Sequence, residues 1–335
     1  MRKKFFAIWS ILLVLVISIA VLVPGCGDGA RYDLTMAVSP AGSGTATDLT
    51  GASPYASGTA VNITATALGS YQFVKWTAPA GTFADPNAAT TTFTMPAQNV
   101  TVTANFVEPL DHFLSYDVPE WLEYVGEEVS LKDQFVDITV TVEWTLDFLN
   151  PAAKNLTESW PSILHPDYHL TIYGFNYTPT QYWKVQVENQ FTSGPQWLDI
   201  WGPVALAVPT QKLVPGDHGF PEGLDHFLAY LVLQGPYLET PASVKDEFCP
   251  PEGEAVTVWS PVEFFVPVQK THGAEVTDIK NPLAHLVFYE ITGAQVSYPE
   301  VQVANQFFAK NLTLGEPANK LGVPTLKLDF YESQG

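Results

Sequence analysis

The chain has 335 residues, of which 46% are hydrophobic and 15% are charged, so it is long enough for two or three domains and apolar enough to build cores. It carries 35 acidic side chains against 15 basic ones, for a formal net charge of −20, and its arginines are Arg2 and Arg31. Nucleic-acid binding depends on clustered lysine and arginine, so this balance argues against a nucleic-acid partner.

The N-terminus predicts an export signal. A basic start at residues 2–4 precedes an apolar run over residues 5–23. The Val-Pro-Gly-Cys sequence that ends at Cys26 resembles the lipobox of bacterial lipoproteins, although Pro24 replaces the usual small or aliphatic residue. The resemblance implies cleavage before Cys26 and lipid transfer to its thiol, which would anchor the chain in a membrane. An uncleaved membrane anchor is the alternative, and both interpretations place the rest of the chain outside the cytoplasm.

The segment that follows predicts a small β domain. Period-two alternation of apolar and polar residues over Leu34–Val38, Ala60–Ala65 and Val100–Phe106 is typical of half-buried strands. A Tyr-Gln-Phe-Val-Lys-Trp strand ending at Trp76 and a Phe-Thr-Met-Pro turn complete the pattern, which resembles the internalin-B-type repeat of bacterial surface proteins. The resemblance implies a β-grasp-like spacer without catalytic residues, with Trp76 in its core.

The rest of the chain contains the same pattern four times. Each unit opens with His-φ-x-x-Tyr, has Gln or Glu followed by Phe 21 or 22 residues later, and closes with Pro-x-x-Lys. The histidines are spaced by 57, 57 and 59 residues. The opening pairs, which we expect to form a structural framework, are His112 and Tyr116, His169 and Tyr173, His226 and Tyr230, and His285 and Tyr289.

The four units alternate in type, because the first and third open with Asp-His-Phe whereas the second and fourth open with His-Leu. We therefore expect two tandem β-sandwich or barrel-like domains, each made of two units of about 57 residues. Alternation places His112, Leu114, Tyr116 and Val118 on one strand face. The whole chain is predicted to be all-β, with a signal peptide at 1–25, the surface repeat at 26–107, a first β copy at 108–212, a linker at 213–223 and a second β copy at 224–335.

The repeated phrases resemble an uncharacterised repeat family of exported bacterial proteins, in which a cysteine before each Tyr pairs with one near the closing Pro. Here those places hold Ser115, Ile172, Ala229 and Phe288, and about Leu149, Val208, Val266 and Val323. The resemblance implies that mostly apolar packing has replaced the cross-links. The other cysteine of the chain, Cys249, is expected to be an unpaired thiol.

Few patterns in the sequence point to chemistry. His165, Asp167 and His169 stand at i, i+2 and i+4 and are candidate zinc ligands, but the corresponding stretch of the fourth unit lacks two of the three. Trp183, Trp197 and Trp201 crowd into the second unit; they are either core residues or an exposed aromatic surface for sugars. No metal, cofactor or catalytic motif is predicted.

The leading hypothesis is a lipid-anchored, extracytoplasmic and non-enzymatic protein with an adhesive, structural or ligand-binding role at the cell surface. Its partner would be an extracellular protein or glycan. A carbohydrate-binding protein that uses exposed tryptophans is the first alternative. An unrecognised hydrolase, with histidine and carboxylates from different units in one cleft, is the second.

Overall fold

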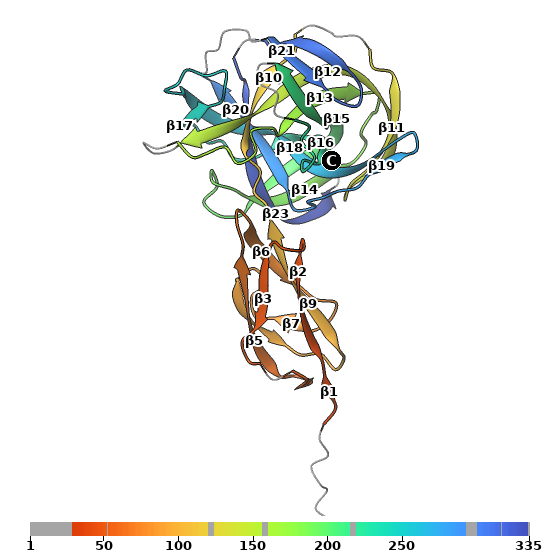
Figure 1. Cartoon of the computed structure of the whole chain (residues 1–335), viewed down its shortest axis with the longest axis vertical. Coiled ribbons are helices and arrows are strands. Elements are labelled where there is room, and N and C mark those ends of the chain that lie inside the picture. The colour runs from red at the N-terminus through yellow and green to blue at the C-terminus, as the bar shows by residue number, and fades with distance from the viewer. Residues whose placement is uncertain are drawn as a thin grey trace, which may run out of the picture.

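The computed structural model describes residues 29–51, 53–119, 124–155, 160–214, 219–292, 300–315 and 317–333, and the regular structure within them is all β-strand. The predicted signal peptide and Cys26 lie outside these described residues. Figure 1 shows a small N-terminal domain joined to a larger, sheet-rich body. The predicted all-β class, with a small domain before a larger β region, is therefore confirmed.

The N-terminal domain contains the strands expected from the alternating segments. Strands β2, β9 and β6 form one sheet, in which β2 and β9 run parallel, and β3, β5, β8 and β7 form a second sheet. The nine strands are β1 (Arg31–Tyr32), β2 (Leu34–Ser39), β3 (Gly44–Asp48), β4 (Tyr55–Ala56), β5 (Ala60–Ala67), β6 (Gln72–Thr77), β7 (Thr82–Phe83), β8 (Thr90–Thr94) and β9 (Val100–Val107).

The inward residues of these strands make a separate core. Trp76 is 1% exposed, as predicted, and packs with Phe93 and Phe106. Glycine is required at Gly81, where φ is +91° and a β-carbon would come within 2.3 Å of the Phe93 ring. This domain thus folds around its own apolar residues.

Eight antiparallel strands of the larger body close into a ring. Each opening strand pairs with the long strand of its own unit and with the long strand of the preceding unit, and β23 closes the circuit by pairing with β10. In order around the ring, the strands are β10 (His112–Asp117), β12 (Asp137–Asn155), β13 (His169–Phe175), β15 (Gln196–Val214), β16 (His226–Gln234), β18 (Glu254–His272), β20 (His285–Thr292) and β23 (Lys320–Ser333).

Shorter strands form an outer layer that ties opposite units together. They are β11 (Glu127–Lys132), β14 (Tyr182–Glu188), β17 (Thr240–Lys245), β21 (Glu300–Ala304) and β22 (Ala309–Thr313), with β19 (Glu275–Thr277) on the end of β18. Strands β11, β14 and β17 each pair with the long strand of their own unit, whereas β21 pairs with β22. Strands β11, β14, β17 and β21 each also pair with the far end of the long strand two units away.

The two predicted copies therefore share one sheet. Strands β15 and β16 join the first copy to the second along the ring, and β10 and β23 join them again where the ring closes. The boundary at 213–223 separates the copies in sequence, but their backbone hydrogen bonds cross it. The reason is that a unit leaves both edges of its strands unpaired until a neighbouring unit covers them.

The two faces of the ring build two cores. Phe113, Leu170, Phe227 and Leu286 belong to a cluster to which seven ring strands contribute, so this cluster fills the interior. The opposite face carries Leu114, Tyr116 and Val118, as the alternation predicted, and packs beneath the outer strands.

The positions at which the resemblance implies paired cysteines form cross-strand pairs inside the ring. Ser115 lies opposite Leu149, as predicted. The other three partners lie one residue before the predicted Val208, Val266 and Val323, because only that register places both side chains on the inner face. The observed pairs are Ile172 with Ala207, Ala229 with Phe265, and Phe288 with Gly322.

Candidate functional site

Each framework tyrosine is held by a turn that comes from two units away. The residue before each Gln-Phe or Glu-Phe is Asp in the first and third units and Asn in the second and fourth, and its side chain hydrogen-bonds the tyrosine hydroxyl. The pairs are Asp133 with Tyr230, Asn189 with Tyr289, Asp246 with Tyr116, and Asn305 with Tyr173, at 2.7, 3.0, 2.8 and 2.8 Å. We call these four contacts the latches.

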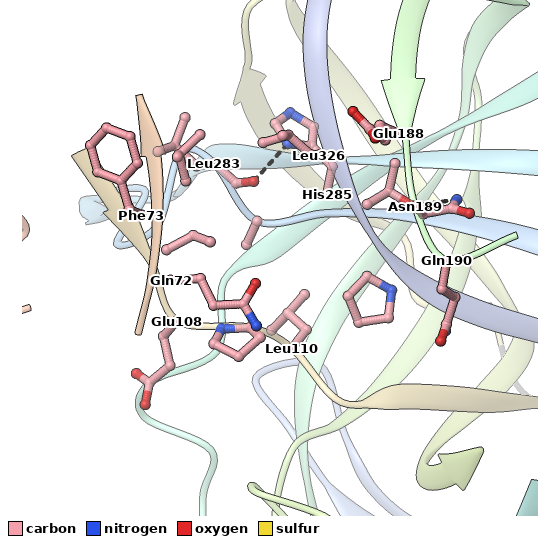
Figure 2. A pocket seen from close by; sticks show the side chains of 16 residues that line it. Gln72, Phe73, Glu108, Leu110, Glu188, Asn189, Gln190, Leu283, His285 and Leu326 are labelled. Atoms are coloured by element: carbon pink, nitrogen blue, oxygen red, sulfur yellow. Dashed lines mark hydrogen bonds between the residues drawn. The ribbon is translucent and has the colours of Figure 1, made fainter. Parts of the chain in front are cut away.

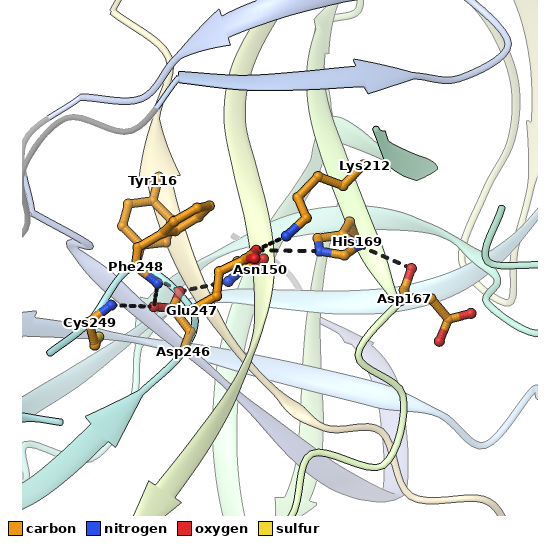
Figure 3. Close-up of polar contacts among 9 residues, drawn as sticks. All are labelled: Tyr116, Asn150, Asp167, His169, Lys212, Asp246, Glu247, Phe248 and Cys249. Carbon is orange, nitrogen blue, oxygen red and sulfur yellow. Dashed lines mark hydrogen bonds and ion pairs between the residues drawn. The ribbon is translucent and has the colours of Figure 1, made fainter. Parts of the chain in front are cut away.

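The Asp246 latch shows how local sequence positions the group (Figure 3). Its Oδ1 accepts hydrogen bonds from the backbone N–H groups of Phe248 and Cys249, a turn that short acidic side chains favour. Its Oδ2 accepts from the Tyr116 hydroxyl and from Asn150 Nδ2, both at 2.8 Å. The Phe248 ring then packs edge-on against Tyr116, with centroids 5.4 Å apart.

The framework histidines form a cyclic series at one end of the ring. Each faces the Gln or Glu of the next unit, and the first unit follows the fourth. Gln190 contacts His112, Glu247 Oε1 lies 4.0 Å from His169 Nε2, Gln306 hydrogen-bonds His226, and Gln134 Nε2 lies 3.3 Å from His285 Nε2. Repetition in every unit favours the predicted structural role.

Three of the four closing lysines contact the next unit at the same end of the ring. Lys212 is fully buried and pairs with Glu247, and Lys270 donates to Gln306 Oε1 at 2.6 Å. Lys154 Nζ instead lies 4.3 Å from the centre of the Phe191 ring. These side chains connect consecutive units through the Gln-Phe or Glu-Phe hairpin turns.

Burial determines the protonation of this framework. Desolvation lowers the pKa of His112, His226 and His285 to about 3, so these rings are neutral at physiological pH. Desolvation also raises the pKa of Tyr289 to about 12 and lowers that of Lys154 to about 8. Neutral, hydrogen-bonded rings are suited to holding strands together and are poor proton shuttles near neutral pH.

The three candidate zinc ligands do not converge. His169 Nδ1 contacts the backbone oxygen of Asp167, whereas His165 Nε2 lies 3.5 Å from Glu108 and its Nδ1 lies 3.4 Å from Asp111. Among the residues that the structure describes, no group of three His, Cys, Asp or Glu side chains is arranged for a metal ion. The extended-chain spacing was therefore insufficient, because His165 and His169 reach different neighbours.

A cavity of about 270 Å³ lies where the two domains meet (Figure 2). The N-terminal domain contributes Gln72 and Phe73, the connection contributes Glu108, and the larger body contributes Glu188 and His285. His285 Nδ1 contacts the Leu283 backbone oxygen at 3.0 Å, and its other ring nitrogen faces Gln134. Both nitrogens of this histidine are thus engaged by the protein.

The three clustered tryptophans separate onto two faces of one hairpin. Trp183 is 5% exposed and packs against Phe135 and Tyr230, so it is a core residue. Trp197 is 40% exposed and Trp201 is partly exposed on the opposite face. The sequence analysis treated the three tryptophans as one group. Strand alternation instead places Trp183 in the core and the other two on the exposed face.

A buried charge cluster in the ring was missed by sequence reasoning. Lys320 Nζ lies 3.4 Å from Asp147 and 3.3 Å from Glu263, and Ser115 Oγ lies 3.1 Å from Asp147. Desolvation raises the pKa of Asp147 to about 6. Alignment on the closing prolines would have indicated the cluster, because the residues four places earlier are Asp147, Ala205, Glu263 and Lys320.

Cys249 is half-buried and unpaired, and desolvation raises the pKa of its thiol to about 12. A thiol with that pKa is a weak nucleophile near neutral pH.

In the described part of the chain, no helix is long and apolar enough to cross a membrane.

Comparison with known families supports the two-part layout. Residues 34–109 match the divergent InlB B-repeat domain, and residues 169–323 match a repeat of unknown function, DUF7450. No curated protein and no solved structure matches the chain. These repeat families indicate a surface or extracellular repeat protein. The chain therefore contains a segment that matches a divergent InlB B-repeat domain, followed by a segment that matches the DUF7450 repeat.

Proposed function

We propose that the protein is a membrane-anchored lipoprotein that displays the closed ring outside the cytoplasm on its B-repeat domain, as a binding or structural element without enzymatic activity. The order of segments carries this proposal. A lipobox-like sequence at Cys26 precedes the B-repeat, and the ring body follows it.

The chemistry of the framework supports a non-enzymatic role. The histidines, lysines and tyrosines that recur in every unit are occupied in contacts between units, as at Lys212 with Glu247 and Tyr116 with Asp246. An active site needs its groups once and needs them open to substrate. Groups that repeat four times and connect units instead serve the fold.

Metabolic labelling with a radioactive fatty acid tests the anchor. The wild-type chain should incorporate label and partition with membranes, and Cys26→Ala should lose the label, because the thiol is the acceptor. Cys249→Ala is the matched control and should keep the label. Label that persists in Cys26→Ala would refute the lipid anchor.

A further inference from the structure

We infer that one exposed face of the larger body binds a neutral polysaccharide through stacking on aromatic rings. The face is formed by outward-facing residues of three neighbouring strands, in the order β15, β14 and β23. In the strand register, Trp201 lies opposite Tyr182, and Asp199 lies opposite Lys184, which in turn lies opposite Tyr331. We call Tyr182, Lys184, Trp197, Asp199, Trp201 and Tyr331 the aromatic face.

The rings of this face are open to solvent. Trp197 is 40% exposed and Tyr331 is 49% exposed, and their ring centroids lie 5.3 Å apart. Tyr182 and Trp201 are partly exposed beside them. Aromatic rings that remain in water retain apolar area that a ligand with a flat apolar side can cover.

A polar pair lies among the rings. Lys184 Nζ donates to Asp199 Oδ1 at 2.5 Å, and the two side chains are 35% and 30% exposed. An ammonium group has three N–H donors and a carboxylate has about four acceptor positions, so one shared hydrogen bond leaves others for a ligand. Hydroxyl groups on a sugar ring need both kinds of partner.

The fold does not require aromatic residues here. The corresponding exposed face of the first unit carries Glu128, Ser130 and Thr139, and that of the fourth carries Gln302 and Asn311. The positions just named in these two hairpins hold no aromatic residue, although Tyr124, which is 51% exposed, lies against Trp144 beside the first hairpin. Among these three hairpins, the second therefore presents Tyr182, Trp197 and Trp201 on this face, and β23 of the fourth unit adds Tyr331.

The last strand widens this face. Strand β23 extends to Ser333, six residues beyond its closing Lys327, whereas β15 and β18 end two residues beyond Lys212 and Lys270. The extension pairs with β14 and brings Tyr331 beside Trp197. Trp197 and Trp201 are four residues apart, so the face spans about 13 Å along β15, at roughly 3.3 Å per residue.

The charge of the body selects the kind of glycan. Residues 108–335 carry 31 acidic side chains and ten lysines, so polyanions are repelled. Flat rings flanking a donor–acceptor pair fit a neutral chain of β-linked pyranoses, which presents apolar C–H faces and equatorial hydroxyls. This inference rests on the proposed surface display, since polysaccharides are ligands that a displayed protein meets.

Titration of intrinsic tryptophan fluorescence tests the inference. The full chain is kept in a zwitterionic detergent, because sugar detergents would compete, and is titrated with cellohexaose, chitohexaose and an anionic alginate oligosaccharide. We expect saturable binding of a neutral oligosaccharide and weaker binding of alginate. Trp197→Ala and Tyr331→Ala should each weaken binding at least about tenfold, which corresponds to one lost stacking contact.

Trp259→Ala is the matched control. Trp259 is a partly exposed tryptophan of the third unit, and its Nε1 donates to Thr292 Oγ1 at 2.9 Å. This variant should bind as the wild type does, and Tyr331→Phe should retain binding because it keeps the ring. The exposed positions of Trp197 and Tyr331 predict small changes in Tm for their variants, and Tyr331→Phe covers the case in which an alanine variant misfolds.

Several outcomes would overturn the inference. They are no saturable binding of either neutral oligosaccharide by the wild type, tighter binding of alginate, or equal losses in Trp259→Ala and Trp197→Ala. A wild-type dimer that Trp197→Ala converts to monomer would instead identify the face as a contact between copies. Fatty-acid labelling at Cys26 is read separately, so failure of glycan binding leaves the proposed display unaffected.

Discussion

Lys320 stands inside the ring at a position where the other units have Asp147, Ala205 and Glu263. It lies within 3.4 Å of both carboxylates, which are largely shielded from water. Buried charges of this kind are weak evidence for added stability, but removing one partner leaves the others uncompensated. Lys320 is thus a structural charge within the ring.

Lys320→Met should lower the free energy of unfolding by about 3 kcal/mol, because Asp147 and Glu263 lose their cation. The measurement is chemical denaturation at neutral pH. The triple variant Lys320→Met, Asp147→Asn, Glu263→Gln is the control and should recover much of the loss. Equal stability of Lys320→Met and wild type would show that water already compensates the carboxylates.

The latches decide how the secondary-structure elements assemble. Each outer turn hydrogen-bonds a tyrosine of the opposite unit, so Asp246 of the third unit positions Tyr116 of the first. Asn150 also donates to Asp246, and its counterparts in the other units are valines. In the first and third units, an aspartate of the turn accepts a hydrogen bond from the tyrosine hydroxyl. In the second and fourth units, an asparagine donates a hydrogen bond to the hydroxyl.

Asp246→Ala should lower the free energy of unfolding by about 3 kcal/mol, because it leaves Tyr116 and Asn150 as buried groups without an acceptor. Equilibrium unfolding in urea measures this change. Asp246→Asn combined with Asn150→Val reproduces the chemistry of the even units and should be more stable than Asp246→Ala. Equal destabilisation by both would argue against the latch as the source of the effect.

At the scale of the whole molecule, His165 connects the two domains. Its Nε2 lies 3.5 Å from Glu108, which also accepts a hydrogen bond from Ser70 of the B-repeat at 2.9 Å. The polar contact with Asp111 is the largest of the effects that raise the pKa of His165 above its ordinary value of 6.5, and the charges of Asp111 and Glu108 add to it. The protonated ring is therefore favoured in the folded junction.

The sign of the pH dependence follows from this raised pKa. The stabilising contribution of His165 is fully present below the unfolded-state pKa near 6.5 and is lost as the pH rises through the folded-state value. His165→Ala should thus reduce Tm more at pH 5 than at pH 9. His272→Ala is the control. It removes a solvent-accessible contact with Glu127 and should change Tm little. A reduction at pH 9 as large as at pH 5 would contradict the assignment.

Local patterns were sufficient for much of this architecture. Period-two alternation identified the strands and the buried face that carries Leu114 and Tyr116, because a strand's two faces are encoded residue by residue. The core position of Trp76 was instead implied by the resemblance to the internalin-B-type repeat. The spacing of His112, His169, His226 and His285 identified four units. The same pattern could not separate Trp183 from Trp197 by role until the hairpin's register was known.

The sequence by itself determined the all-β class, the order of the two repeat types and the four-unit framework, since each rests on short-range spacing. Only the tertiary structure decided that the two copies close one ring, that each latch crosses to the opposite unit, and that Asp147, Glu263 and Lys320 meet inside it. The sequence of a single unit does not specify which other strand will pair with the edges of its strands. Their pairing is decided when all four units bury their apolar faces together, and this leaves the rings of Trp197 and Tyr331 on the outside.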